Sequence, residues 1–118
     1  MKSSLRQTQP KVVVCLYDLA LWYLQRTNRY PRNWRITLGD QIDRLMLKMV
    51  AAGQRAALRS AKLTILEELS DDLEVLRILT RLSADLKCLD AKQFEFVVRQ
   101  MAEIGRQIGG WLKQQGKR

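Results

Sequence analysis

Apolar side chains recur every three or four residues along most of this chain, and this spacing restricts its fold more than any other feature. In the second half, for example, leucines stand at Leu66, Leu69, Leu73, Leu76 and Leu79. Such spacing places them on one face of an α-helix, whereas a half-buried strand alternates apolar and polar residues. No useful length of the chain alternates in that way. The pattern therefore predicts an all-α protein.

Start and stop signals divide the pattern into four predicted helices. Pro10 suits the first turn of a helix, and Pro31 ends that helix because the residue before a proline is disfavoured in the α conformation. The spacing of a capping box begins the second helix at Thr37 and the fourth at Asp90. The predicted helices cover residues 10–28, 37–57, 60–87 and 91–114, with frayed basic ends. Because the connections are short, we expect one domain over residues 1–118 that forms an up-down-up-down four-helix bundle.

The first predicted helix is apolar on nearly all sides. Residues 12–24 contain 12 apolar residues in 13. This run is too short to cross a bilayer, and no cleavage site of a signal peptide follows it, so we expect a cytoplasmic protein without membrane contact. A monomeric bundle would cover one apolar face of this helix and expose the other. The other face therefore predicts self-association or a permanent partner. We expect an interface between copies, formed by Val12, Cys15, Leu19 and Trp22.

The absence of histidine argues against most catalytic and metal-binding functions, because histidine is the commonest acid–base group and transition-metal ligand near neutral pH. Glycine-rich loops that bind nucleotide phosphates are also absent. Carboxylates such as Glu67 and Asp71 could hold Mg²⁺ through waters, but a solvated acidic face near a helix start explains them as well. Cys15 and Cys88 are expected as unpaired thiols, with a single disulfide as the alternative. We expect no enzyme, no metal and no cofactor.

The net charge of +9 is concentrated in the first half of the chain. Residues 1–59 contain 11 Lys or Arg and 3 Asp or Glu, whereas residues 60–118 contain 10 and 9. An excess of this kind favours a polyanionic partner, which could be nucleic acid, an anionic membrane or an acidic protein.

Residues 26–35 form the densest basic cluster, with four arginines, no carboxylate and two aromatic residues. Arginine side chains bind phosphates and aromatic rings stack on bases, so the mixture suits single-stranded or structured RNA. Alternatively, Tyr30 and Trp34 close the end of the bundle while the arginines are solvated. The arginines of this cluster are Arg26, Arg29, Arg32 and Arg35.

Arg77 and Arg81 form a second basic pair, one turn apart on the third predicted helix. They could bind an acidic partner or two neighbouring phosphates together, or they could simply be solvated and paired with nearby carboxylates. The flanking Leu76, Leu79 and Leu82 are predicted to face inward.

Glycines interrupt the fourth predicted helix, although glycine costs about 1 kcal/mol relative to alanine inside a helix. Gly105 and Gly109 lie on one face, where we expect another helix of the bundle to approach closely. Trp111 is expected to cover the end of the bundle.

Three segments, taken together, resemble the Avd-like four-helix proteins. Tyr-Pro-Arg-Asn-Trp-Arg at 30–35 with Thr-Leu-Gly at 37–39 resembles the junction between their first two helices. Leu-Arg-x-x-x-Arg-Leu at 76–82 resembles their third helix. Ile-Gly-Arg-Gln-Ile-Gly-Gly-Trp-Leu at 104–112 resembles their fourth helix and is the most specific of the three. The match keeps this order from about residue 12 to about residue 113.

Avd is the accessory variability determinant of diversity-generating retroelements, and its relatives include proteins encoded in intervening sequences of bacterial large-subunit rRNA genes. The resemblance implies a homopentameric barrel with a strongly positive surface. Five copies of this chain would together carry a net charge of +45 (5 × 9). It also implies binding to the retroelement's reverse transcriptase and to template RNA and DNA, in support of mutagenic copying. The chemistry would then belong to the reverse transcriptase.

One departure from the family pattern and one difference from a branch of the family bear on this expectation. Gln41 stands where a basic residue is expected, so a basic role at that position is in doubt. Val-Ala-Ala-Gly at residues 50–53 lacks the Ser-Ile-Pro-like segment of the intervening-sequence branch, which favours the retroelement branch. Two alternatives stay open, namely an rRNA- or ribosome-associated protein of that branch and a pure protein-interaction module.

Overall fold

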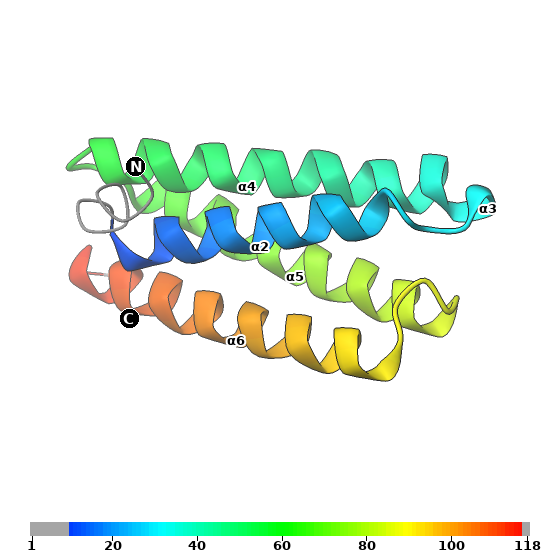
Figure 1. Cartoon of the computed structure of the whole chain (residues 1–118). Helices are drawn as coiled ribbons and strands as arrows, with labels where there is room; N and C mark the ends of the chain where they lie inside the picture. The colour runs from blue at the N-terminus through cyan, green and yellow to red at the C-terminus, as the bar shows by residue number, and fades with distance from the viewer. Residues whose placement is uncertain (1–9, 117–118) are drawn as a thin grey trace.

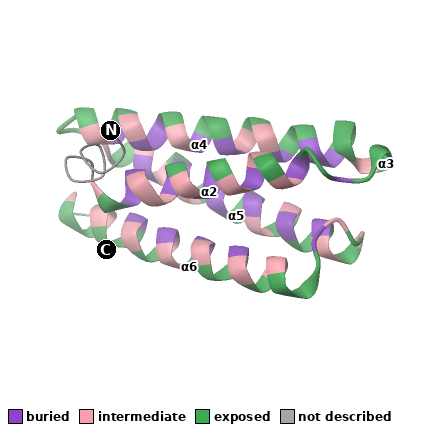
Figure 2. Ribbon diagram, in the orientation of Figure 1, coloured by how far each residue is buried: buried purple, intermediate pink, exposed green. Residues whose placement is uncertain are grey.

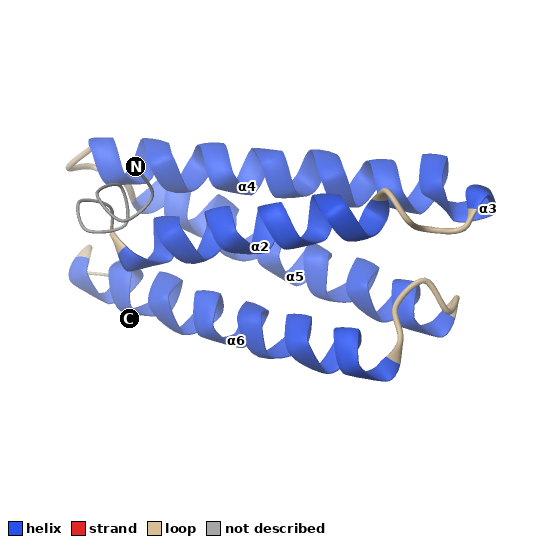
Figure 3. Ribbon diagram, viewed as in Figure 1, coloured by secondary structure: helices blue, strands red, loops and turns tan. Residues whose placement is uncertain are grey.

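The computed structural model describes residues 10–116 and shows a bundle of four long helices (Figures 1 and 3). These helices run up, down, up and down, and the described residues contain no strand. A short helix, α3, and a π-helical turn, η1, lead directly into the second long helix. The elements are α2 (Lys11–Thr27), α3 (Arg32–Trp34), η1 (Arg35–Gly39), α4 (Asp40–Leu58), α5 (Leu63–Asp85) and α6 (Ala91–Gln114). The predicted all-α four-helix bundle is thus confirmed.

Each long helix packs against two others, so that α2 and α5 occupy opposite corners of the bundle. α2 packs against α4 and α6, and α5 packs against the same two helices. The core draws on all four, with Leu16, Ile42, Leu76 and Ile104 each 1% exposed or less. Figure 2 shows the buried residues on the sides of the helices that face one another.

The predicted start of the second helix is wrong, because helical structure begins at Arg32 and not at Thr37. Pro31 adopts an extended conformation, and its carbonyl accepts hydrogen bonds from the backbone amides of Trp34 and Arg35. A proline excludes its preceding residue from the α region but is itself well suited to precede a first turn. The chain therefore breaks before Pro31, and Thr37 lies inside the continuous helical rod.

Two buried tyrosines link the first helical hairpin to α5. The Tyr23 hydroxyl lies 2.6 Å from Oγ1 of Thr80, and the Tyr30 hydroxyl donates to Oγ of Ser83 over 2.9 Å. Burial raises the pKa of both phenols above the ordinary value. These bonds satisfy polar groups that would otherwise be costly in the core, and they hold the turn before α3 against α5.

Glycines allow close approach at two of the helix contacts. A methyl group on Gly53 would lie 2.7 Å from Cδ1 of Leu16, so α2 and α4 approach each other closely there. A methyl group on Gly105 would lie 3.0 Å from Nη2 of Arg77, which belongs to α5. The packing role predicted for Gly109 is wrong, because its Cβ position has no atom within 4 Å among the described residues.

None of the described helices combines the length and the hydropathy needed to cross a bilayer.

Candidate nucleic-acid and partner interface

The arginine-rich segment of residues 26–35 is mostly helical, although the sequence predicted a connection between helices at residues 29–36. Only residues 28–31 form a turn, which is followed by α3 and η1. Arg29, Arg32 and Arg35 are exposed, and none of them forms an ion pair with another described residue. They lie at the α3 end of the bundle (Figure 1), where their guanidinium groups are open to an external anion.

Arg26 differs from the other three arginines of this segment. Its guanidinium carbon lies 5.0 Å from the centre of the Trp22 ring, a cation–π distance, and both side chains belong to α2. Its Nε is buried without a hydrogen-bond acceptor among residues 10–116. Arg26 is therefore packed on the bundle, and only part of its guanidinium is open to a ligand.

Tyr30 cannot stack on a base, so that prediction is wrong. Its side chain is 2% exposed, and its hydroxyl is bonded to Ser83 in α5. Trp34 is half-buried and packs against the core. These positions agree with the alternative interpretation of the sequence, in which the rings of Tyr30 and Trp34 close the end of the bundle.

Arg77 and Arg81 do not act as a matched pair in this structure. Nε of Arg77 bonds to Oε2 of Glu74 over 3.1 Å, and its Nη2 lies next to Gly105 of α6. Arg81 is exposed and forms no ion pair within the described part of the chain. The inward orientation predicted for Leu82 is also wrong, since that side chain is 43% exposed. Arg81 is thus the more accessible of the two cations.

The predicted interface between copies at Val12, Cys15, Leu19 and Trp22 is covered by the chain itself. Val12 and Leu19 are 4% and 2% exposed, and the ring of Trp22 packs on Phe96 of α6 at 5.3 Å between centres. The prediction is wrong because α2 lies in the angle between α4 and α6, which cover one face each. The residues that α2 leaves exposed are different ones.

A second basic surface, which the sequence reasoning missed, runs along α4. Residues 44–66 contain five Lys or Arg and no Asp or Glu, and this uninterrupted run was the signal that could have revealed it. Lys48 is bound to Asp72 over 3.2 Å. Lys62 lies 4.7 Å from the centre of the Trp111 ring, at the end of the bundle. The other three, Arg44, Arg55 and Arg59, are exposed.

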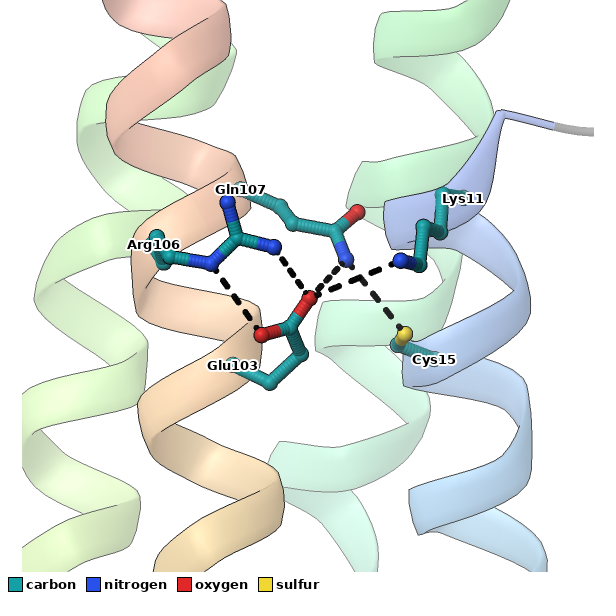
Figure 4. Close-up of polar contacts among 5 residues, drawn as sticks. All are labelled: Lys11, Cys15, Glu103, Arg106 and Gln107. Carbon is teal, nitrogen blue, oxygen red and sulfur yellow. Dashed lines mark hydrogen bonds and ion pairs between the residues drawn. The ribbon is translucent and has the colours of Figure 1, made fainter.

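A polar cluster joins the start of α2 to α6 (Figure 4). Glu103 accepts hydrogen bonds from Nη2 of Arg106 and Nε2 of Gln107, each over 2.6 Å, and Lys11 lies 3.9 Å away. The bonds from Arg106 and then Gln107 lower the pKa of Glu103 to about 2. Gln107 also contacts Sγ of Cys15, whose pKa is raised by burial. Because the carboxylate is satisfied by its own chain, we interpret the cluster as a helix-to-helix link.

The described residues contain no group of three His, Cys, Asp or Glu side chains placed to hold a metal ion. Cys15 and Cys88 are both free thiols. The exposed arginines suit the binding of polyanions, and the exposed apolar side chains suit contact with proteins.

Comparisons with known proteins give one match. A family model described as bAvd-like matches residues 9–115 of the chain. Searches of curated proteins and of solved structures found no match.

Proposed function

This chain belongs to the bAvd-like family, and on that premise we propose that it is a non-enzymatic accessory protein of a diversity-generating retroelement. It binds the reverse transcriptase of the retroelement together with template RNA and DNA, and it supports mutagenic copying of the RNA into DNA (mutagenic retrohoming). It acts in the cytoplasm as an assembly of copies, which the resemblance makes a pentamer. The reverse transcriptase supplies the catalysis.

The exposed arginines at the α3 end carry the nucleic-acid part of this proposal. Arg29, Arg32 and Arg35 lie within seven residues of one another in sequence, and they form no ion pair with other described residues. Each guanidinium presents donors in a planar fork that fits two oxygens of one phosphate. Because phosphates carry no sequence information, such contacts bind RNA and DNA with little sequence preference.

Net charge supports the same proposal. Each copy carries +9, so an assembly of five would carry +45 (5 × 9) and would attract nucleic acid over several ångströms. Binding of this kind releases counterions, so the affinity falls steeply as the salt concentration rises.

The test is a salt titration of binding to single-stranded RNA and DNA. The variant Arg29→Ala/Arg32→Ala removes two cations at the α3 end, and the control Arg99→Ala/Lys113→Ala removes two exposed cations of α6 that belong to neither basic surface. If each of the first two arginines neutralises one phosphate, the log–log salt slope of that variant becomes shallower by roughly 1.5 for each copy that engages the strand. The control keeps the wild-type slope.

Equal slopes and affinities for the wild type and both variants would contradict this assignment of the arginines. Binding that does not respond to salt at all would contradict the nucleic-acid function as a whole.

A further inference from the structure

The elements α3, η1 and α4 follow one another without a break and form one helical rod over residues 32–58 (Figure 1). At 1.5 Å per residue the rod is about 40 Å long. Residues 29–62, which include the rod, contain eight Lys or Arg and two Asp or Glu, so they hold +6 (8 − 2) of the net charge of +9. Most of the excess charge of the chain therefore lies on or beside this one element.

Three large apolar side chains are strongly exposed along the rod. Ile36, Leu47 and Leu58 are 73%, 56% and 74% exposed. Each is eleven residues from the next, which is about three helical turns, so the three side chains follow one line along the rod. We call them the aliphatic line. The bundle core does not use this line, which leaves it open to a ligand.

Three arginines form a row on α4 beside the aliphatic line. Arg44 and Arg55 are also eleven residues apart, and Arg59 follows one turn later. Each of the first two stands three residues before a leucine of the aliphatic line, so the guanidinium groups and the leucines are neighbours on the helix surface. All three arginines are exposed, and none forms an ion pair within residues 10–116. We call them the arginine row.

The carboxylates nearby leave the arginine row positive. Asp43 accepts a hydrogen bond from Thr27, so its carboxyl group is directed toward α2. Asp72 reaches α4 from α5 and is bound there by Lys48 over 3.2 Å. Asp40, at the start of α4, is the one exposed carboxylate on the rod.

A cationic row beside an apolar line fits a single-stranded nucleic acid. Arginine side chains bind its phosphates, and the faces of its unpaired bases lose contact with water when they pack on aliphatic side chains. In a duplex the bases are paired and stacked inside, and each backbone winds once around the axis in about 34 Å. A straight row on a rod of about 40 Å therefore follows a flexible single strand better than it follows a duplex.

We propose that a single strand of RNA or DNA runs along the rod from the α3 end, with its phosphates on the arginine row and its bases on the aliphatic line. A stacked strand rises about 3.4 Å per nucleotide, so the rod accommodates roughly 12 nucleotides. This inference rests on the proposed function, because nucleic-acid binding is part of that function. It adds the path of the strand, the single-stranded form of the ligand and an apolar contact to the bases.

The test is a salt titration of binding to labelled oligo(dT) of about 12 nucleotides, a length that matches the rod, by fluorescence anisotropy. Arg44→Ala/Arg55→Ala should make the log–log salt slope shallower by roughly 1.4 (2 × 0.7) for each copy that engages the strand. Leu47→Ser/Leu58→Ser should lower the affinity several-fold and keep the wild-type slope, because it removes apolar contacts and no charge.

Controls separate these contacts from general effects of a surface change. Arg99→Ala/Lys113→Ala removes two exposed cations of α6, and Val98→Ser changes an apolar residue of α6 that is 36% exposed. Both controls should keep the wild-type affinity and slope. Circular dichroism and light scattering verify that every variant is folded and keeps the wild-type mass. A duplex of the same length, and vesicles of phosphatidylserine and phosphatidylcholine, should compete only weakly for the labelled strand.

Four results would overturn the inference. The first two are a wild-type slope for Arg44→Ala/Arg55→Ala and a wild-type affinity for Leu47→Ser/Leu58→Ser. The third is a duplex or vesicle that binds more tightly than the single strand. The fourth is a lower mass for Leu47→Ser/Leu58→Ser, which would assign the aliphatic line to a contact between copies.

The proposed function is tested separately by the arginines at the α3 end. Any of the four results, together with a shallower slope for Arg29→Ala/Arg32→Ala, refutes the path along the rod and leaves the proposed function standing. A wild-type protein that binds neither RNA nor DNA would refute the nucleic-acid part of the proposed function as well.

Discussion

Replacing Gly53 by alanine should destabilise this protein, whereas the same replacement at Gly109 should stabilise it. Both glycines lie inside long helices, Gly53 in α4 and Gly109 in α6. Helix propensity alone predicts a gain of up to about 1 kcal/mol for either change. The surroundings of the new methyl group therefore decide the sign of the effect.

The structure gives the size of the difference. At Gly53 the new methyl group would lie 2.7 Å from Cδ1 of Leu16, whose side chain is fully buried and cannot move without displacing its neighbours. Overpacking of this kind costs about 1–3 kcal/mol, so the net effect is a loss of about 0–2 kcal/mol. At Gly109 no described atom lies within 4 Å, so the gain of about 0.5–1 kcal/mol remains. The two variants should differ by about 1–3 kcal/mol.

Urea denaturation followed by circular dichroism, at one protein concentration for all variants, measures this difference. Adding Leu16→Val to Gly53→Ala removes a methyl group at the point of conflict, so the double variant should lose less stability than the sum of the single changes. A Gly53→Ala variant as stable as Gly109→Ala would refute the close contact between α2 and α4.

Three further outcomes follow from the structure. Arg77→Glu/Arg81→Glu should abolish association with the reverse transcriptase or with nucleic acid, as pull-down and binding assays would reveal. It should change the free energy of unfolding by less than about 1 kcal/mol, because both side chains are at least partly exposed. Tyr30→Phe should cost about 1 kcal/mol in urea denaturation, through the lost bond to Ser83, and should leave nucleic-acid affinity unchanged. Because the folded pKa of Glu103 is lowered from 4.5 to about 2, its contribution to stability is complete above pH 4.5 and is lost as the pH falls toward 2. Glu103→Gln should therefore make the unfolding free energy less sensitive to pH across that window, as urea titrations at several pH values would reveal.

Local signals in the sequence were sufficient to predict most helix ends. Asp90 and Gln93 form the predicted capping box, with bonds of 2.8 and 2.9 Å between each side chain and the backbone amide of the other. The start of the second helix was mispredicted because two local signals compete there. Thr37 has the spacing of a cap, but Pro31 permits helical structure to begin at Arg32, five residues before the predicted start, and the earlier start prevails.

The site was harder to predict because exposure depends on contacts between distant residues. The basic segment could be found from charge alone, but Tyr30 is buried by a partner 53 residues away in sequence. In the same way, the periodicity of α2 indicates that several of its faces are apolar, but not which of them α4 and α6 cover. That depends on how the helices pair, and the exposed line at Tyr17 and Leu21 emerges only once they do.

Co-purification with the reverse transcriptase of its own retroelement tests the accessory function most directly. The two proteins are co-expressed, this chain carries the affinity tag, and nuclease treatment removes any nucleic acid that could bridge them. The proposed function predicts that the reverse transcriptase is retained after nuclease treatment. A folded wild-type protein that retains no reverse transcriptase, with or without nuclease, would contradict it.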